Sequence, residues 1–426
     1  MSGRTTERIR VLLMALTVAL TALSIFGVAV TGSEKETTEL AQDSSSTRYL
    51  SDGPGRPSAP ARAPAPTPVE PPAAGAPAAT PSIPAQRPST ASKVPLPPTA
   101  APRPAPAAPR PSSSAAAGSP AAGYLFGAHS VWRTDISQAP TAPNSAGMVD
   151  LLVGTVNDRY GGVAAFNAHS YGVGYYVAAP GTPTVDVAFH DCQGKGHVPE
   201  GLFGPSGQFE DVPIPAGAVP ADGTDGTLAV YSPQTDTLWE FWVASQDARG
   251  AWQACWGGRM DGVAANLGFF SGNFGVSASG LSVAGGMISL ADVRAGSVAH
   301  AMSLHIPGPA AHPRLSWPAQ RTDGNNSHPD ALPEGTRLRL DPSIDVASLG
   351  LHPVAAMVAE AAQRYGFIVV DQAGAVAVVT ESGAAEQAAT GVDPWDALLG
   401  GTPDYLVMQN FPWDRLQVLP QDHGRP

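Results

Sequence analysis

Residues 228–243 read LAVYSPQTDTLWEFWV, and this stretch points most clearly to the fold class. It contains two largely apolar runs, 228–232 and 237–243, separated by proline, threonine and aspartate residues that favour a turn. Short runs rich in aromatic and β-branched residues, bounded by turn residues, are typical of β-strands. We therefore predict two strands here, on which every second side chain shares a face.

The same pattern recurs on both sides of this stretch. Apolar residues alternate with smaller or polar ones over 171–177 and 185–189, and turn residues return at short intervals. Near the C-terminus, the runs 367–371 and 376–380 flank Gln372-Ala373-Gly374-Ala375, which predicts a hairpin. Many short strands of this kind indicate a β-sandwich or jelly roll.

Helices are expected to be few. Residues 353–365 carry apolar side chains at helical spacing, with Pro353 suited to the first turn and Gly366 suited to the C-terminal cap. A second short helix is predicted over 149–158. Helices this sparse pack at the edge of a β architecture. We predict that residues 124–420 form a mostly β domain, namely a jelly-roll or concanavalin-like β-sandwich with one or two short helices.

The chain before this domain has a different composition. Proline and alanine dominate between Pro54 and Pro120, and large apolar side chains are rare there. Such a segment cannot bury enough apolar surface to offset the entropy lost on ordering. We therefore predict that residues 32–123 form a disordered Pro/Ala-rich stalk, which at about 3.1 Å per residue would hold the domain far from its point of attachment.

Residues 1–31 have the pattern of an export element. Arg4, Arg8 and Arg10 precede an uncharged run over 11–30, which is long enough to cross a bilayer as a helix. We predict a single-pass transmembrane helix in the cell membrane, with the C-terminal domain extracellular. The alternative is a cleaved signal peptide, which would release a secreted protein.

Charge and cysteine content narrow the class of partner and the compartment. Residues 124–426 contain 13 Lys and Arg against 29 Asp and Glu, so the domain repels nucleic acid phosphates. We therefore predict no nucleic acid partner. The two cysteines, Cys192 and Cys255, favour one disulfide in an exported chain, with two separate buried thiols as the alternative.

An aromatic and acidic cluster supplies the leading functional hypothesis. On the strand over 237–243, Glu240 and Trp242 share one face, and Trp256 and Asp261 follow closely in the chain. An indole stacks on the apolar face of a sugar, while glycoside hydrolysis needs two carboxylates. We expect Glu240 as acid or nucleophile with Asp261 or Asp371 as its partner, and Trp242 and Trp256 as a stacking platform. The alternative is that these aromatic residues belong to the core, with Glu240 at a solvated rim.

A basic cluster supplies a second hypothesis. Arg337 and Arg339 alternate with leucines and so point off one strand face, where paired guanidinium groups suit carboxylate recognition. With His300 as a further catalytic candidate and Tyr365, they loosely resemble the Arg, His and Tyr constellation of jelly-roll alginate lyases. The resemblance is to residue types only, because Arg337-Leu338-Arg339 replaces that family's R-x-E-x-R motif. The alternative is that the arginines of this region pair with nearby carboxylates, namely Asp323, Glu334, Asp341 and Asp345.

Two stretches have the residue types of metal sites without the matching spacing. His190, Asp191, Cys192 and His197 match no common zinc pattern. The oxygen-rich segment 323–330 resembles a calcium-binding turn but lacks the glycine placement and bidentate glutamate of an EF-hand loop. We therefore predict no metal and no cofactor.

The domain resembles a group of exported proteins common in actinobacteria. The residues that carry the resemblance are Val131-Trp132, Pro143-Asn144-Ser145-Ala146, 212–216, 225–233, Trp239-Glu240-Phe241-Trp242, 334–338, Tyr365-Gly366-Phe367 and Asn410-Phe411-Pro412-Trp413-Asp414. The group has no assigned activity, so the resemblance implies only a β-sandwich scaffold that acts on or binds surface material. We expect a carbohydrate-active protein, with a glycoside hydrolase acting on a polysaccharide or cell-envelope glycan as the leading interpretation. The alternatives are a non-catalytic carbohydrate-binding module or adhesin, a polysaccharide lyase, and a structural envelope protein.

Overall fold

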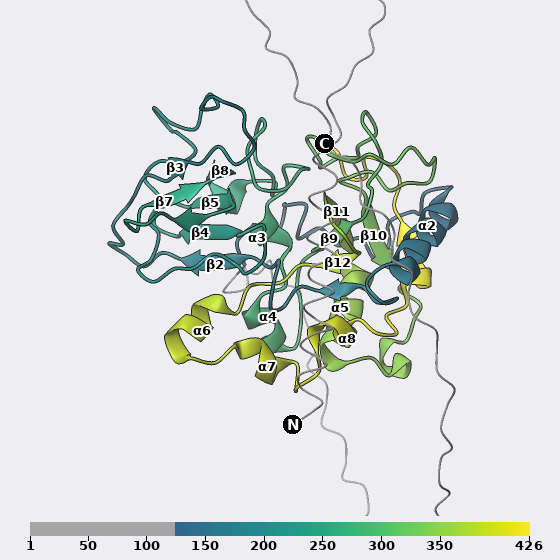
Figure 1. The fold of residues 1–426 in the computed structure, drawn as a ribbon. Helices are drawn as coiled ribbons and strands as arrows, with labels where there is room; N and C mark the ends of the chain where they lie inside the picture. The colour runs from purple at the N-terminus through teal and green to yellow at the C-terminus, as the bar shows by residue number, and fades with distance from the viewer. Residues whose placement is uncertain (1–123) are drawn as a thin grey trace, which may run out of the picture. The chain divides into compact units, whose positions relative to one another are not determined.

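The computed structural model describes residues 124–426, which form three β-sheets with short helices around them (Figure 1). The predicted transmembrane helix over 1–31 and the predicted stalk over 32–123 lie outside the described residues. Within residues 124–426, no helix has both the length and the apolar character needed to cross a membrane. The described part of the chain is therefore β-rich, with mixed sheets and few helices, and is compatible with a β-sandwich.

The largest sheet has six strands in the order β1-β12-β9-β11-β10-β13. Its strands are β1 (Ala165–Phe166), β9 (Met302–Ile306), β10 (Arg337–Leu340), β11 (Phe367–Gln372), β12 (Ala377–Val378) and β13 (Leu416–Val418). Strand β9 pairs parallel with β11 and antiparallel with β12, whereas β10 pairs antiparallel with β11 and β13.

The hairpin predicted over 367–380 is wrong, although strands do form on both sides of its turn. Strand β9 lies between β11 and β12 and pairs with each of them. Neighbouring strands are about 4.8 Å apart, so the four residues 373–376 easily reach across one intervening strand. The amide of Ala373 donates to the carbonyl of Ile306, so the connection itself is bound to the inserted strand.

The other two sheets are built from residues 228–243 and the segments on either side of them. The four-stranded sheet has the order β2-β4-β5-β8, with β2 (Gly174–Val177), β4 (Leu228–Ser232), β5 (Thr237–Trp242) and β8 (Trp256–Asp261). The three-stranded sheet has the order β3-β7-β6, with β3 (Ala188–Phe189), β6 (Ser245–Gln246) and β7 (Trp252–Ala254). Strands β4 and β5 are antiparallel across the predicted turn, in which Asp236 adopts a positive φ of 49°.

The predicted disulfide is present and fixes the edge of this region. Cys192, in the loop after β3, is bonded to Cys255, which lies between β7 and β8. The two residues are 63 positions apart in the chain.

The predicted helices are confirmed with small changes in their ends. Helix α5 (Pro353–Arg364) has proline in its first turn, and Gly366 follows with a positive φ of 75°. Helix α2 (Ser145–Asp158) begins four residues before the predicted start. The prediction of one or two helices is too low, because the described residues also form five short ones. These are α3 (Val283–Gly286), α4 (Leu290–Ala295), α6 (Ala384–Thr390), α7 (Pro394–Leu398) and α8 (Asp404–Val407), with 3-10 helices η1 (Val263–Ala265), η2 (Val346–Leu349) and η3 (Trp413–Arg415).

Three apolar clusters connect the sheets and helices. The largest packs α2 and α5 against one face of the six-stranded sheet, through residues such as Leu152, Val358 and Phe367. The second lies between sheets and joins Ile368 of β11 to Leu238 of β5. The third covers the opposite face of β5, where Trp239 and Phe241 are buried. Strand β5 therefore has an apolar layer on each side.

Candidate functional site

Glu240, the first predicted catalytic residue, is wholly buried, with an exposed fraction of 0%. Its carboxylate accepts hydrogen bonds from the hydroxyl of Ser282 at 2.6 Å and from the amides of Val283 at 3.1 Å and Ala284 at 3.0 Å. These donors form the first turn of α3, so Glu240 joins β5 to that short helix. Burial raises the pKa of Glu240 to about 7, while the three hydrogen bonds act in the opposite direction.

The expectation that one face of this strand is open is wrong, because five of the six residues of β5 are buried. Leu238, on the Glu240 face, belongs to the cluster between sheets, whereas Trp239 belongs to the cluster behind β5. Only Trp242, the last residue of the strand, is partly exposed. This placement gives no support to contact between Glu240 and a substrate.

Trp242 and Trp256 lie directly opposite each other on the antiparallel strands β5 and β8. Side chains at opposite positions share a face with their Cβ atoms about 5 Å apart. Both indoles are partly exposed. The structure therefore brings together the two residues that the sequence predicted as a stacking platform.

Each indole of this pair is held by a polar contact at its edge. Nε1 of Trp242 donates to the exposed carboxylate of Asp225 at 3.2 Å, and Nε1 of Trp256 donates to the carbonyl of Asn273 at 3.1 Å. The Trp256 ring also stacks on Phe274, with centroids 5.7 Å apart, and the exposed Lys195 lies 4.6 Å from its centroid. These contacts orient the rings at the surface.

Asp261 lies at the opposite end of β8 from Trp256. It pairs in register with Thr237, whose hydroxyl donates to its carboxylate at 3.0 Å. The guanidinium of Arg259 donates to the same oxygen at 2.9 Å. Its hydrogen-bonding partners are therefore different from those of Glu240, and the structure joins the two carboxylates by no contact that would pair them.

Asp371 has carboxylate neighbours other than those predicted. Oxygens of Asp323, Glu334 and Asp371 all lie within 4.8 Å of one another. Asp371 comes from the end of β11, Asp323 from the loop after Arg321, and Glu334 from the segment before β10. We call these three residues the carboxylate cluster. Asp323 is exposed, Asp371 is partly buried, and Glu334 is completely buried.

The electrostatic environment of the carboxylate cluster favours protonation. Burial, followed by the charges of Asp371 and Asp323, raises the pKa of Glu334 to about 11. Burial and the charge of Asp323 raise the pKa of Asp371 well above its ordinary value, although the amides of Ala278 and Gln372 donate to its carboxylate. Burial also raises the pKa of Asp323. At neutral pH this group of carboxyls therefore retains protons.

One loop connects the carboxylate cluster to the tryptophan pair. Arg321, which lies two residues before Asp323, donates to the carbonyls of Phe274, Gly275 and Ser277. The amide of Ala278, which follows Ser277 in the chain, donates to the carboxylate of Asp371. Phe274, in the same segment, stacks on Trp256. Segment 273–278 is therefore in contact with both groups.

The arginines predicted to recognise a carboxylate bind backbone carbonyls instead. Arg337 donates to Val131 at 2.9 Å, and Arg339 donates to Ile136 at 2.7 Å and Ser137 at 2.9 Å. Both side chains are buried on β10, whose four residues are all buried. They therefore fasten the N-terminal loop of the described domain to β10.

The other two members of the predicted lyase constellation are also buried and have other partners. His300 stacks on Tyr124 with centroids 4.5 Å apart, and its imidazole lies 3.4 Å from Asp292. Tyr365 packs in the cluster between sheets, beneath the guanidinium of Arg364. His300 and Tyr365 therefore contribute to the packing around α4 and α5.

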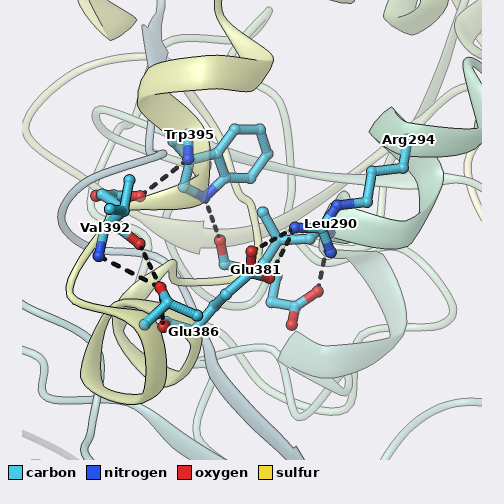
Figure 2. Close-up of polar contacts among 8 residues, drawn as sticks. Leu290, Arg294, Glu381, Glu386, Val392 and Trp395 are labelled. Carbon is cyan, nitrogen blue, oxygen red and sulfur yellow. Dashed lines mark hydrogen bonds and ion pairs between the residues drawn. The ribbon is translucent and has the colours of Figure 1, made fainter.

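A further acidic group, missed in the sequence, lies where α4, α6 and α7 meet (Figure 2). A carboxylate oxygen of Glu381 accepts the amide of Leu290 at 2.9 Å, and its carbonyl accepts Nε1 of Trp395 at 2.9 Å. Beside it, one guanidinium nitrogen of Arg294 donates to both carboxylate oxygens of Glu386. Burial raises the pKa of Glu381 to about 7. These contacts tie the C-terminal helices to α4.

Sequence reasoning placed Asp323 and Glu334 near one another only as partners for arginines. Their proximity to Asp371 cannot be read from the sequence, because it depends on the tertiary contact between the end of β11 and two loops.

Comparison with known proteins adds no relative: no family model, no curated protein and no solved structure matches the chain. The resemblance to exported actinobacterial proteins therefore stays a prediction.

Proposed function

We propose that residues 124–426 form a carbohydrate-binding domain displayed outside the cell, with Trp242 and Trp256 as its sugar platform. The observation that carries this proposal is the direct cross-strand pairing of two partly exposed indoles. Aromatic faces carry partial negative charge and pack well against the polarised C–H groups of a pyranose ring. Two adjacent rings provide a surface that matches a glycan chain.

The polar groups beside the platform suit the same ligand. Asp225 is exposed next to Trp242, and its carboxylate can accept hydrogen bonds from sugar hydroxyls. Lys195, over the Trp256 ring, is exposed and is carried on a flexible stem, so a sugar can displace it at little cost. Recognition would then combine stacking with hydrogen bonds at the rim, as small-ligand sites commonly do.

Glycan-binding measurements on the purified protein test this proposal. Trp242→Ala and Trp256→Ala should each weaken binding at least tenfold, which corresponds to about 1.4 kcal/mol. Phe203→Ala, which removes an exposed aromatic ring outside the pair, should leave affinity unchanged. Wild-type protein that retains no polysaccharide, or variants that bind as tightly as wild type, would reject the proposal.

Glycoside hydrolysis is the second candidate function, and the carboxylate cluster favours it. Retaining enzymes place their two carboxyl groups about 5–5.5 Å apart, and the carboxylate oxygens here lie within 4.8 Å of one another. Asp371, whose pKa is raised well above its ordinary value, would be the acid, and the more exposed Asp323, whose pKa burial also raises, would act as the nucleophile in its ionised form. Asp371→Asn should then abolish release of sugar products while glycan retention persists. Product release that survives this change would exclude the mechanism.

The proposal also includes a location outside the cell. Display at the cell surface rests on the sequence of residues 1–31 and 32–123, as a single-pass anchor or a cleaved signal followed by a stalk. Separation of cells from medium distinguishes the two, because only an anchored domain stays with the cells. Protease treatment of the intact cells should then remove it.

The jelly-roll or concanavalin-like connection order also stays a prediction, and the parallel pairing of β2 with β4 and of β9 with β11 departs from an all-antiparallel order.

A further inference from the structure

The carboxylate cluster has the dimensions of a metal-binding site. Oxygens of Asp323, Glu334 and Asp371 lie within 4.8 Å of one another. Two oxygens on opposite sides of a calcium ion, each about 2.4 Å from the ion, are about as far from each other as the oxygens of this cluster are. One ion at the centre of the cluster can therefore contact all three carboxylates.

Glu334 gives an independent reason to expect a ligand. Its side chain is completely buried, and no N–H or O–H group donates to either carboxylate oxygen with regular hydrogen-bond geometry, although Thr322 and Asp323 lie near enough to influence its pKa. Buried polar atoms are normally paired, because leaving one unpaired destabilises the folded state. One of these oxygens converges with an oxygen of Asp323 and an oxygen of Asp371. A cation bound between them would provide the missing partner.

The surrounding residues do not neutralise the cluster by direct contact. Arg321 influences all three carboxylates electrostatically, but its guanidinium donates to the carbonyls of Phe274, Gly275 and Ser277. Asp371 receives two backbone amides, which are neutral donors. Burial is the main cause of the raised pKa values of the three acids, and the charges of neighbouring carboxylates raise the pKa values of Glu334 and Asp371 further.

We propose that Asp323, Glu334 and Asp371 bind one hard divalent cation, with Ca²⁺ as the preferred ion. Carboxylates are the ligands that Ca²⁺ favours, and its six to eight coordination positions leave room for water or a ligand hydroxyl beside the exposed Asp323. The calcium-like segment 323–330 lacked a glutamate ligand in the sequence, and the fold supplies one in Glu334. The site goes beyond the proposed sugar platform and does not depend on it. It is an alternative to the hydrolase candidate, because a bound cation would occupy the carboxylates that hydrolysis needs.

The cation would join three segments of the domain. Asp371 ends β11, Glu334 precedes β10, and Asp323 follows the arginine that holds segment 273–278. A ligand that binds the folded state alone stabilises it in proportion to its concentration relative to its dissociation constant. Calcium should therefore raise the melting temperature. It should also restrict movement of segment 273–278, in which Phe274 stacks on Trp256.

Calcium titration of the whole protein after EDTA treatment and dialysis tests the site, with no glycan present. Isothermal titration calorimetry should show one ion per chain, and CaCl₂ should raise the melting temperature. Glu334→Gln and Asp323→Asn should each weaken calcium binding at least tenfold and reduce the thermal shift. Glu381→Gln, which changes a carboxyl outside the cluster, should bind calcium as wild type does.

The outcomes separate this site from the sugar platform. Wild-type protein without saturable calcium binding, or a folded Asp323→Asn variant that binds as wild type does, would overturn the proposal. Because Asp323 is exposed, its replacement tests the site even where Glu334→Gln fails to fold. Trp242→Ala should keep full calcium affinity, so loss of glycan binding in that variant bears only on the platform.

Discussion

The hydroxyl of Ser282 donates a 2.6 Å hydrogen bond to the carboxylate of Glu240, although the two residues are 42 positions apart in the chain. The Ser282 hydroxyl also accepts the amide of Gly285, so it caps α3 while it holds β5. The amides of Val283 and Ala284 complete the set of donors around Glu240. A buried carboxylate thus replaces the backbone partners that this short helix lacks at its start.

Glu240→Gln should destabilise the domain at pH 5, by about 1–3 kcal/mol. A protonated glutamate still accepts hydrogen bonds on both oxygens, whereas the amide nitrogen of glutamine faces a backbone N–H and leaves it unpaired. Urea unfolding measures the difference, and Glu360→Gln, on the exposed side of α5, is the matched control.

The same substitution should change the pH dependence of stability. The pKa of Glu240 is about 7 in the folded protein and near 4.5 when unfolded, so the folded state holds the extra proton between these values. Wild-type stability should fall by about 3 kcal/mol as pH rises through this window, and the glutamine variant should lack this component. The deficit of the variant should therefore shrink between pH 5 and pH 8. A deficit that grows over this range would contradict the assignment.

Breaking the disulfide should cost about 4 kcal/mol in the chain-entropy model, because Cys192 and Cys255 close a loop over a separation of 63 residues. The double variant Cys192→Ser and Cys255→Ser removes the bond without leaving a free thiol. Its midpoint of urea unfolding should match that of wild-type protein in reducing agent. Equal stability of wild type with and without reductant would show that the crosslink does not limit unfolding.

Local patterns predicted the elements of this fold better than the contacts between them. The strands around 228–243 and the helix over 353–364 follow from spacing of apolar residues, turn residues and capping residues. Insertion of β9 between β11 and β12 could not be predicted, because a short connection has the same local sequence whether it forms a hairpin or skips one strand. Partner choice depends on packing across the whole sheet.

The candidate site shows the same limit. Alternation correctly placed Glu240 and Trp242 on one face, and pairing with β8 then brought Trp256 beside Trp242. Alternation does not report what covers a face, so the burial of Glu240 under α3 was not predictable. The carboxylate cluster joins residues as far apart as Asp323 and Asp371, which only tertiary structure brings together.

Arg339→Ala should destabilise the domain by about 2–4 kcal/mol, because it leaves the buried carbonyl of Ile136 and the partly buried carbonyl of Ser137 without their charged donor. Arg339 also donates to Gln417 on β13, so its loss loosens two segments. Arg249→Ala, at an exposed ion pair, should change stability by less than about 1 kcal/mol. Glycan affinity should be unchanged in both folded variants. A selective loss of glycan binding in Arg339→Ala would restore a role in recognition.

His305 should make the domain sensitive to acid. Burial lowers its pKa to about 4, and Nε2 has no hydrogen-bond partner. It lies beside Asp371 in the register of β9 and β11. Below its ordinary pKa of 6.5 the unfolded chain takes up a proton that the folded state excludes, so this contribution to stability is lost as pH falls from 6.5 to 4.

Comparison with His305→Phe isolates this contribution. Glu240 and Glu381, whose folded pKa values are about 7, favour the folded state as pH falls, and they are present in both proteins. The stability of wild type relative to His305→Phe should therefore decrease steadily between pH 7 and pH 4 in urea unfolding. His197→Phe, at an exposed histidine, should run parallel to wild type over the same range. Parallel curves for His305→Phe and wild type would show that the folded state accommodates the charged imidazole, and would place His305 in contact with water or with an ionised Asp371.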